Sequence, residues 1–329
     1  MNVRKLISSF GLALVVFASL FADLTKAFAQ PAALPGEFAI STYLKSAYIT
    51  ALGGGGLTVG AVNTMPNSIG PYQRFKLLKA GAQDQHYFIQ TSSGNFLTAV
   101  SGGGRTTDVF HTDATQPLDW EKFKFGLPSG VGWGTIQTVK GYYVTALGGG
   151  GKAEDSAFHT DAIQLGQVPA PTWEWYYVQK CGDLGPNMEY AIYPTSSGSL
   201  WNPIGGGGRV LGAIGSGLWE DGARFKFIRQ DDGSFALQTP NGRNYVTAIQ
   251  GGGLASGTSA WDALVTDRTQ VQAWEKFRIV DDGQCKYTFQ TVSGFYIGAG
   301  PSFSTRISDP NAAGQIGYNA KFKLIPYGL

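Results

Sequence analysis

A short polar pattern occurs twice in the sequence with the same residue types and the same spacing. It reads Phe-His-Thr-Asp-Ala at residues 110–114 and again at 158–162, and a reduced form, Val-Thr-Asp-Arg, occupies 265–268. A carboxylate accepts hydrogen bonds from vicinal sugar hydroxyls, and an imidazole can donate or accept them. The pattern therefore predicts a sugar pocket used two or three times, with ligand-binding side chains at His111, Asp113, His159, Asp161 and Asp267.

A second pattern supplies aromatic rings. Trp-Glu-Lys-Phe stands at 120–123 and 274–277, and Trp-Glu-Trp-Tyr stands at 173–176. An aromatic face packs well against the C–H surface of a sugar ring. We therefore take the tryptophans as further ligand-binding candidates and expect them to be exposed along one edge at most. These tryptophans are Trp120, Trp173 and Trp274, together with Trp261.

The same residues also have a structural interpretation. Asp and Thr in loops often bond their own backbone and so shape a turn, and this role is favoured for Asp113 and its copies. Phe123, Tyr176 and Phe277 follow the tryptophans at the buried phase of an alternating strand, which predicts core packing for them.

The sequence offers no constellation for catalysis. There are only three histidines and two cysteines, and they show neither H-x-x-x-H nor C-x-x-C spacing. Gly-Ser-Gly at 215–217 lacks the strand-to-helix pattern of a nucleophile elbow. The glycine run at 53–56 lacks the Lys-Ser/Thr of a phosphate loop. Because no general acid/base pair can be placed, we expect no enzyme activity, cofactor or metal.

The elements that must position these residues form six related segments. An aromatic-x-Thr-Ala strand followed by a glycine-rich loop, or a weaker form of it, begins near 48, 96, 143, 200, 245 and 295. A Phe-x-Gln-Thr type strand precedes it and the Trp-Glu-x-Phe type strand follows, so each segment predicts four strands over about 50 residues. Propeller blades also have four strands. However, the segments lack a blade signature, and the longest gap, from 143 to 200, divides them into three and three.

Taken in this order, the pattern resembles the fascin-like β-trefoil superfamily over essentially all of the chain beyond residue 29, most closely at 245–277. The resemblance implies that three segments close one trefoil, a six-stranded barrel capped by three hairpins. It therefore implies an all-β fold with two tandem β-trefoils, the first at 30–180 and the second at 181–329. The fourth and sixth segments depart from x-Thr-Ala, with Asn-Pro at 202–203 and Gly-Ala at 298–299.

The resemblance covers actin-bundling proteins as well as carbohydrate-binding modules of secreted proteins. The Gln-x-Trp motif of ricin-B trefoils does not recur at equivalent positions. Because this resemblance is combined with the repeated polar and aromatic patterns, we expect a secreted, non-catalytic, lectin-like protein. We expect it to recognise extracellular or cell-surface glycans. The alternative is a protein-binding, actin-bundling role of the fascin-like kind, so a protein partner stays open.

The N-terminus predicts export. A basic start, an apolar stretch at 6–21 and Ala-Phe-Ala at 27–29 are typical of a signal peptide over 1–29, although an uncleaved anchor is the alternative. Its removal takes three of the 25 basic residues and one of the 23 acidic residues, which leaves 22 of each and no membrane span. This neutrality argues against nucleic acid as partner. We expect an extracellular or periplasmic protein.

The two cysteines, Cys181 and Cys285, form an even count in a chain that we expect to be exported. Such a count favours a disulfide. Nothing in the spacing shows that the two cysteines meet, so the sequence leaves open whether this disulfide forms.

Overall fold

The computed structural model describes most of the chain, while the predicted signal peptide (1–29) and Trp261 lie outside the described residues. The described ranges are 31–126, 133–153, 157–166, 173–195, 200–210, 213–217, 222–254, 263–299, 303–307 and 320–329. Within these ranges the regular elements are β-strands and 3-10 turns. None of their helices has the length and apolar character needed to cross a membrane.

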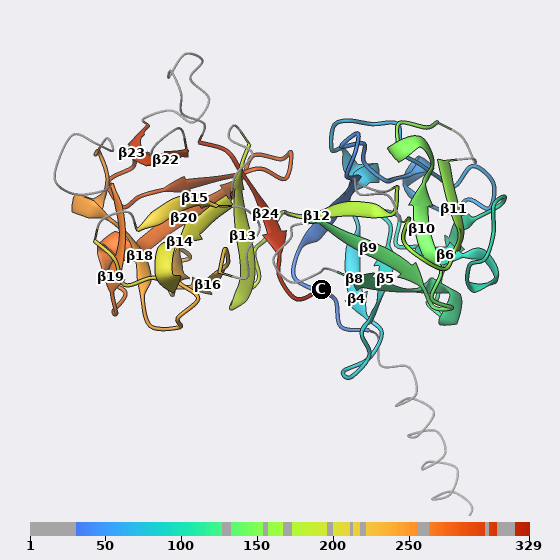
Figure 1. Ribbon diagram of the computed structural model, residues 1–329, viewed down its shortest axis with the longest axis horizontal. Helices are drawn as coiled ribbons and strands as arrows, with labels where there is room; N and C mark the ends of the chain where they lie inside the picture. The colour runs from blue at the N-terminus through green and yellow to red at the C-terminus, as the bar shows by residue number, and fades with distance from the viewer. Residues whose placement is uncertain are drawn as a thin grey trace, which may run out of the picture. The chain divides into compact units, whose positions relative to one another are not determined.

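The first twelve strands fall into three repeats of four, coloured blue to green in Figure 1. The first repeat holds β1 (Glu37–Thr42), β2 (Thr50–Ala51), β3 (Val62–Asn63) and β4 (Lys76–Lys79), with 3-10 turns η1 (Leu52–Gly54) and η2 (Pro71–Gln73). The second holds β5 (His86–Gln90), β6 (Phe96–Ala99), β7 (Phe110–Ala114) and β8 (Lys122–Gly126), with η3 (Val100–Gly102) and η4 (Asp119–Glu121). The third holds β9 (Trp133–Thr138), β10 (Tyr143–Ala146), β11 (Phe158–Ala162) and β12 (Trp175–Cys181), with η5 (Leu147–Gly149).

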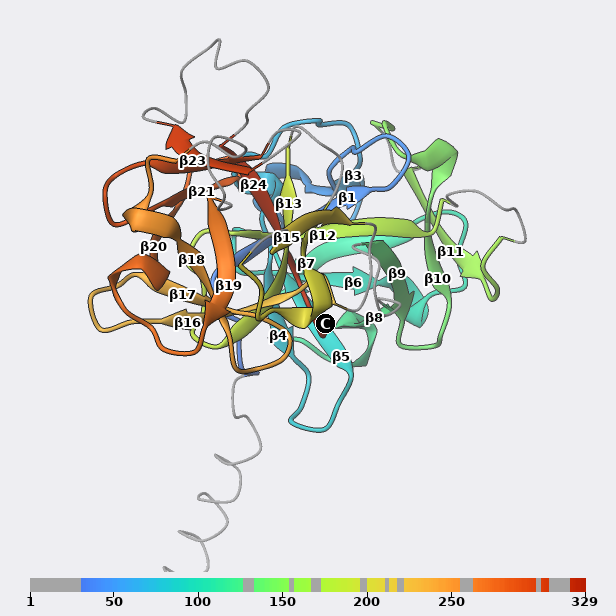
Figure 2. The ribbon, with the colours of Figure 1, turned by 60° about the vertical axis from the view of Figure 1, so that its left-hand side comes forward.

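The other twelve strands repeat this order, coloured yellow to red in Figures 1 and 2. The fourth repeat holds β13 (Met188–Pro194), β14 (Leu200–Pro203), β15 (Ile214–Gly217) and β16 (Phe225–Arg229), with η7 (Ile204–Gly206). The fifth holds β17 (Phe235–Gln238), β18 (Tyr245–Ala248), β19 (Leu264–Arg268) and β20 (Lys276–Asp281), with η8 (Ile249–Gly251) and η9 (Ala273–Glu275). The sixth holds β21 (Tyr287–Gln290), β22 (Tyr296–Ala299), β23 (Phe303–Ile307) and β24 (Phe322–Pro326).

The first and fourth strands of the repeats close two barrels. In the first, antiparallel pairs run β1-β12-β9-β8-β5-β4. The ring closes where Phe38 and Phe75 exchange backbone hydrogen bonds of 2.8 and 2.9 Å. In the second, the pairs run β13-β16-β17-β20-β21-β24 and return to β13. The remaining strands form cap hairpins, so the predicted all-β fold with two tandem β-trefoils of three four-stranded repeats is confirmed.

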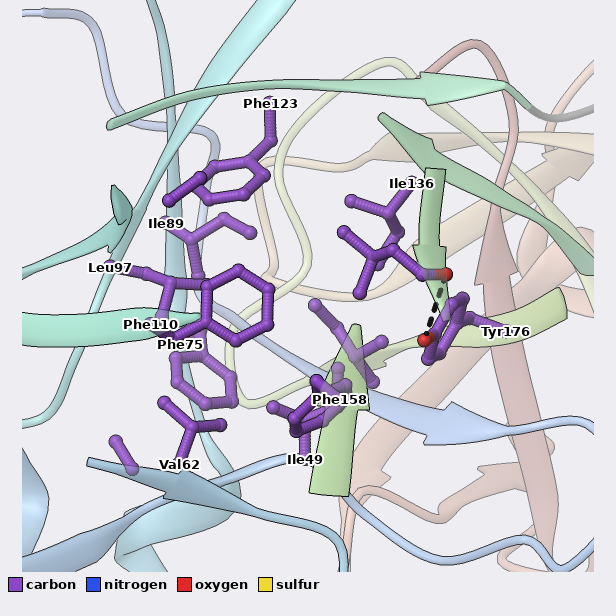
Figure 3. Close-up of a cluster of buried hydrophobic side chains, with 14 of the residues drawn as sticks. Ile49, Val62, Phe75, Ile89, Leu97, Phe110, Phe123, Ile136, Phe158 and Tyr176 are labelled. Carbon is purple, nitrogen blue, oxygen red and sulfur yellow. Dashed lines mark hydrogen bonds between the residues drawn. The ribbon is translucent and has the colours of Figure 1, made fainter. Parts of the chain in front are cut away.

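Each repeat contributes one side chain to every layer of the first barrel's core. Figure 3 shows aromatic and aliphatic side chains from the three repeats pointing into one interior. The layers are Ile40, Ile89 and Ile136; Ile49, Leu97 and Val144; Val62, Phe110 and Phe158; and Phe75, Phe123 and Tyr176. The predicted burial of Phe123, Tyr176 and Phe277 is confirmed, since none of the three has exposed surface. Tyr176 satisfies its hydroxyl by donating to the Val144 carbonyl at 3.2 Å, the dashed line in Figure 3.

A disulfide joins Cys181, the last residue of β12, to Cys285 in the turn between β20 and β21. Both cysteines are fully buried, among Ala39, Tyr48 and Ile69. Since β12 ends at Cys181 and β13 begins at Met188, the segment between the two barrels is 182–187.

The residue before this disulfide, Lys180, is a fully buried lysine. Its Nζ donates to the Cys181 carbonyl at 2.9 Å and the Glu37 carbonyl at 3.4 Å, and it lies 4.8 Å from the centre of the Phe38 ring. Burial lowers the pKa of Lys180 to about 8, against the opposing pull of nearby carboxylates, because an ammonium group loses hydration in the interior.

This lowered pKa predicts a rise of stability with pH. Between about pH 8 and 10.4 the unfolded chain holds the Lys180 proton more often than the folded protein, so this residue's contribution increases with pH. We expect the unfolding free energy of the wild type, relative to Lys180→Met, to gain about 2 kcal/mol between pH 7 and 9.5. Denaturant titrations of both proteins measure it, and tyrosine ionisation cancels in the comparison. An unchanged difference would show that the ammonium group is not desolvated.

Candidate functional site

The central threonine of the His-Thr-Asp pattern has a structural role. Thr112 in β7 is fully buried and binds the glycine-rich loop of the preceding repeat, 55 positions earlier. Its N–H donates to the Leu57 carbonyl at 2.7 Å, and its Oγ1 accepts from the Leu57 N–H at 3.2 Å. The Gly56 N–H, at a φ of +90° that favours glycine, donates to the Thr112 carbonyl at 2.7 Å. Each cap hairpin is thus fastened to its neighbour.

The same fastening recurs twice more in the first trefoil and, among the described residues, once in the second. In every case a glycine and the next residue bind a threonine of the following hairpin through its backbone and its Oγ1. The further sets are Gly104 and Arg105 with Thr160, Gly151 and Lys152 with Thr64, and Gly208 and Arg209 with Thr266. Sequence analysis missed this role, because the threonine was expected to bond only within its own loop.

The flanking histidines and aspartates do not form one repeated constellation. His111 Nε2 lies 2.7 Å from Asp108 Oδ1 rather than on Asp113, which is exposed. His159 Nδ1 lies 3.8 Å from Asp161 Oδ1. Their part in ligand binding therefore stays a prediction.

The third predicted carboxylate, Asp267, has a different environment again. Its Oδ2 lies 3.6 Å from Arg268 Nη1, whereas its Oδ1 is buried and has no hydrogen-bond partner among the described residues. No group of three His, Cys, Asp or Glu side chains in the described part of the chain could hold a metal ion.

The predicted tryptophans stand out from the surface more than expected. Trp120 is 48% exposed, Trp173 45% and Trp274 42%, so the expectation of a single exposed edge was wrong. Each ring lies in the turn that leads into the fourth strand of its repeat, where the next residue turns inward. Tyr72, 47% exposed in η2, occupies the same position in the first repeat and was missed. The sequence could have identified Tyr72, since Tyr-Gln-Arg-Phe at 72–75 aligns with Trp-Glu-Lys-Phe at 120–123.

A buried polar side chain holds each of these turns against its cap hairpin. Glu121, directly after Trp120, accepts from Thr98 Oγ1 at 2.7 Å through Oε1 and from the Leu118 N–H at 2.7 Å through Oε2. Glu275 does the same with Thr247 Oγ1 and the Gln272 N–H, each at 2.8 Å. The threonines are those of the x-Thr-Ala strands, so two sequence motifs meet in one hydrogen-bonded unit.

The other two repeats use variants of this unit. Gln73 donates through Nε2 to Thr50 Oγ1 at 2.9 Å and accepts from the Gly70 N–H at 2.8 Å. Glu174 accepts from Thr145 Oγ1 at 3.2 Å, and its second carboxylate oxygen is buried with no partner in the part of the chain that the structure describes. A turn fixed in this way loses little further freedom when a ligand binds to its ring.

The fourth and sixth repeats have lost both halves of the unit. Asn202 and Ala223 replace the threonine and the glutamate in the fourth, and Gly298 and Ala320 replace them in the sixth. The described unit therefore occurs in four repeats, each with an exposed aromatic ring, and we call these four places the ring sites: Tyr72, Trp120, Trp173 and Trp274.

The glycine-rich turns complete two of the ring sites. A Cβ placed on Gly54 would lie 3.3 Å from Tyr72 Cε1 and 2.9 Å from Ser92 Oγ of the next repeat. A Cβ on Gly251 would lie 3.5 Å from Trp274 Cδ1 and 2.8 Å from Ser293 Oγ. The ring and a serine of the following repeat therefore both lie close to the glycine, in the space that a side chain there would fill.

No protein-family model and no curated protein matches this chain. Three solved structures with similar arrangements share 10% to 12% of residues with it. A mosquitocidal holotoxin is 10% identical over 91% of this chain and 34% of its own, with a TM-score of 0.38. The designed three-fold symmetric protein ThreeFoil is 12% identical over 45% of this chain and 99% of its own, with a TM-score of 0.37. The Rhizoctonia solani agglutinin is 12% identical over 44% of this chain and 96% of its own, with a TM-score of 0.33. The chain spans about a third of the holotoxin, and the trefoil assignment rests on the strand pairing itself.

Proposed function

We propose that this protein is an exported, non-catalytic carbohydrate-binding protein that holds glycans at its ring sites. One observation carries the proposal: four repeats present an aromatic ring, 42% to 48% exposed, at the same position, and each is fixed by a buried Glu or Gln. Exposing so much aromatic surface at four equivalent places favours a ligand with an apolar face.

The surroundings of the rings suit a sugar. A pyranose offers C–H groups to the ring face and hydroxyls to polar neighbours. Next to Trp120, Asp119 Oδ1 and Lys122 Nζ form an exposed pair 2.8 Å apart, which supplies an acceptor and a donor. Next to Trp274, Lys276 pairs with Asp232 at 2.7 Å in the same manner. Because each pair is neutral overall, it favours a polar, uncharged ligand over a polyanion such as nucleic acid.

Several weak sites acting together would provide avidity for a surface rich in glycans. One ring contributes only modestly to binding, since even a pair of aromatic rings is worth about 0.5 to 1.5 kcal/mol beyond area burial. Engagement of several sites raises the overall affinity without new contacts, provided that the glycans can reach them together.

The test is a glycan array probed with the chain from Gln30 to Leu329. We expect binding that falls about two- to tenfold with each of Trp120→Ala, Trp173→Ala and Trp274→Ala, and that is abolished when these three are combined with Tyr72→Ala. Asp113→Ala with Asp161→Ala is the matched comparison. Loss of binding in that variant, with the tryptophan variants unaffected, would move the sites to the His-Thr-Asp strands. Absence of binding to any glycan would overturn the proposal.

The second candidate is a protein-binding role of the fascin-like, actin-bundling kind. The exposed aliphatic side chains of Leu118 and Ile163, each 72% exposed, support it, because aliphatic surface is better matched by a protein than by a sugar. Co-sedimentation with actin filaments separates the two roles, and Leu118→Ser with Ile163→Ser should weaken only the protein interaction.

A further inference from the structure

The four ring sites differ in one side chain that the following repeat contributes. The second glycine of each glycine-rich turn lies against the turn between the first two strands of the next repeat around the barrel. The side chain that a Cβ on this glycine would meet is Ser92 at the site of Tyr72, Lys140 at the site of Trp120, Leu44 at the site of Trp173 and Ser293 at the site of Trp274. The fixed ring is therefore common to the four sites, whereas its polar surroundings are specific to each.

At the second ring site this side chain is a lysine. A Cβ on Gly102 would lie 3.2 Å from Lys140 Cε and 3.3 Å from its Cδ and Cγ, so the stem of the lysine lies along the turn. Gly102 ends η3, which packs against η4, the turn that carries Trp120. At Gly54 and Gly251 the same space borders both the ring and the contributed side chain. Lys140 therefore brings its ammonium group to the edge of the second ring site.

The charge of Lys140 is not paired within the described part of the chain. Lys140 is exposed, and its Nζ takes part in no hydrogen bond or ion pair there. The other exposed charges beside Trp120 belong to Asp119 and Lys122, which pair with each other at 2.8 Å. Glu121 is buried, and both of its carboxylate oxygens already accept hydrogen bonds. The second ring site therefore presents one positive charge that no exposed carboxylate neutralises.

We propose that the second ring site binds an acidic sugar, whose ring packs on Trp120 and whose single anionic group, a carboxylate or a sulfate ester, pairs with Lys140. This inference rests on the proposed glycan binding and adds that one of the four sites selects for negative charge. Lysine is a compact point charge with three donors, so it pairs with either anionic group. One such charge beside a neutral pair suits one acidic sugar unit rather than a polyanion. The corresponding serines and leucine of the other ring sites carry no charge, so those sites hold neutral sugars.

The test isolates the second ring site in the full chain from Gln30 to Leu329. Tyr72→Ala, Trp173→Ala and Trp274→Ala together remove the other three rings, which are exposed, and leave Trp120. The probes are glucose and galactose, the corresponding uronic acids and the corresponding 6-sulfates, titrated by NMR at low and at high salt.

Three changes at lysines are made in this background. Lys140→Met removes the charge and keeps the length of the stem, whereas Lys140→Arg keeps the charge. Lys79→Met is the matched control, because it removes one positive charge from an exposed position of β4 outside the ring sites. Trp120→Ala, added separately, shows whether the measured binding takes place at this ring.

We expect the acidic sugars to bind about two- to fivefold more tightly than their neutral counterparts at low salt. Lys140→Met and high salt should each remove this preference, while Lys140→Arg and Lys79→Met should keep it. Lys140→Met should leave the affinity for neutral sugars unchanged. A preference limited to the uronic acids or to the sulfates would identify the group that Lys140 pairs with.

Two results would overturn the inference and leave glycan binding standing. One is equal binding of acidic and neutral sugars by the isolated site, and the other is a preference that survives Lys140→Met or is lost equally in Lys79→Met. Binding that survives Trp120→Ala, or no binding of any probe, would overturn the proposed function of this ring site together with the inference.

Discussion

Replacing Phe123 by alanine is expected to lower the free energy of unfolding of the first trefoil by about 3 to 5 kcal/mol. Phe123 has no exposed surface, and its ring shares a layer of the core with Phe75 and Tyr176. It also packs against Phe110, with ring centroids 6.2 Å apart. Truncation removes contacts with all three repeats at once and leaves a cavity that the closed barrel cannot collapse. Denaturant unfolding followed by tryptophan fluorescence measures the loss.

Lys122→Ala is the control, since it lies next to Phe123 on the same strand but points outward. We expect a change within about 0.5 kcal/mol for it. Phe277→Ala should produce a loss similar to that of Phe123→Ala, but in the second trefoil, because Phe277 holds the equivalent place in that core. A loss of less than about 1 kcal/mol for Phe123→Ala would contradict the closed three-repeat core.

Removal of the disulfide should lower the free energy of unfolding by a similar amount. The bond closes a loop of 104 positions, for which chain entropy predicts a stabilisation of about 4 to 5 kcal/mol. In the double variant Cys181→Ala/Cys285→Ala we expect the unfolding free energy to fall by up to this amount. The small side chains fit the site, which is lined by Ala39, Tyr48 and Ile69.

Reductant provides the control for the disulfide. It should lower the denaturation midpoint of the wild type toward that of the double variant and leave the double variant unchanged. Equal midpoints for the oxidised wild type and the double variant would contradict a stabilising bond. The glycan binding proposed for Trp120 should be the same in the double variant and the wild type, because Glu121 and Thr98 hold that turn within one repeat.

Local patterns determined much of this protein. Alternating burial placed Phe123, Tyr176 and Phe277 in the core, and recurring glycines marked the turns between four strands in each repeat. Both signals act over a few residues, so the sequence carries them directly. The tryptophans were identified as candidate rings for the same reason. The equivalent Tyr72 could have been identified by aligning it with Trp120.

Only the tertiary structure decided how these pieces meet. Thr112 binds Leu57 in the preceding repeat, and Glu121 binds Thr98, across separations that no local period encodes. The ring of Tyr43 likewise packs edge-on against Trp133 and Trp175, because barrel closure brings β1, β12 and β9 together. Side chains from strands distant in the sequence become neighbours only through that closure, so spacing alone predicted which rings exist but not which of them share a surface.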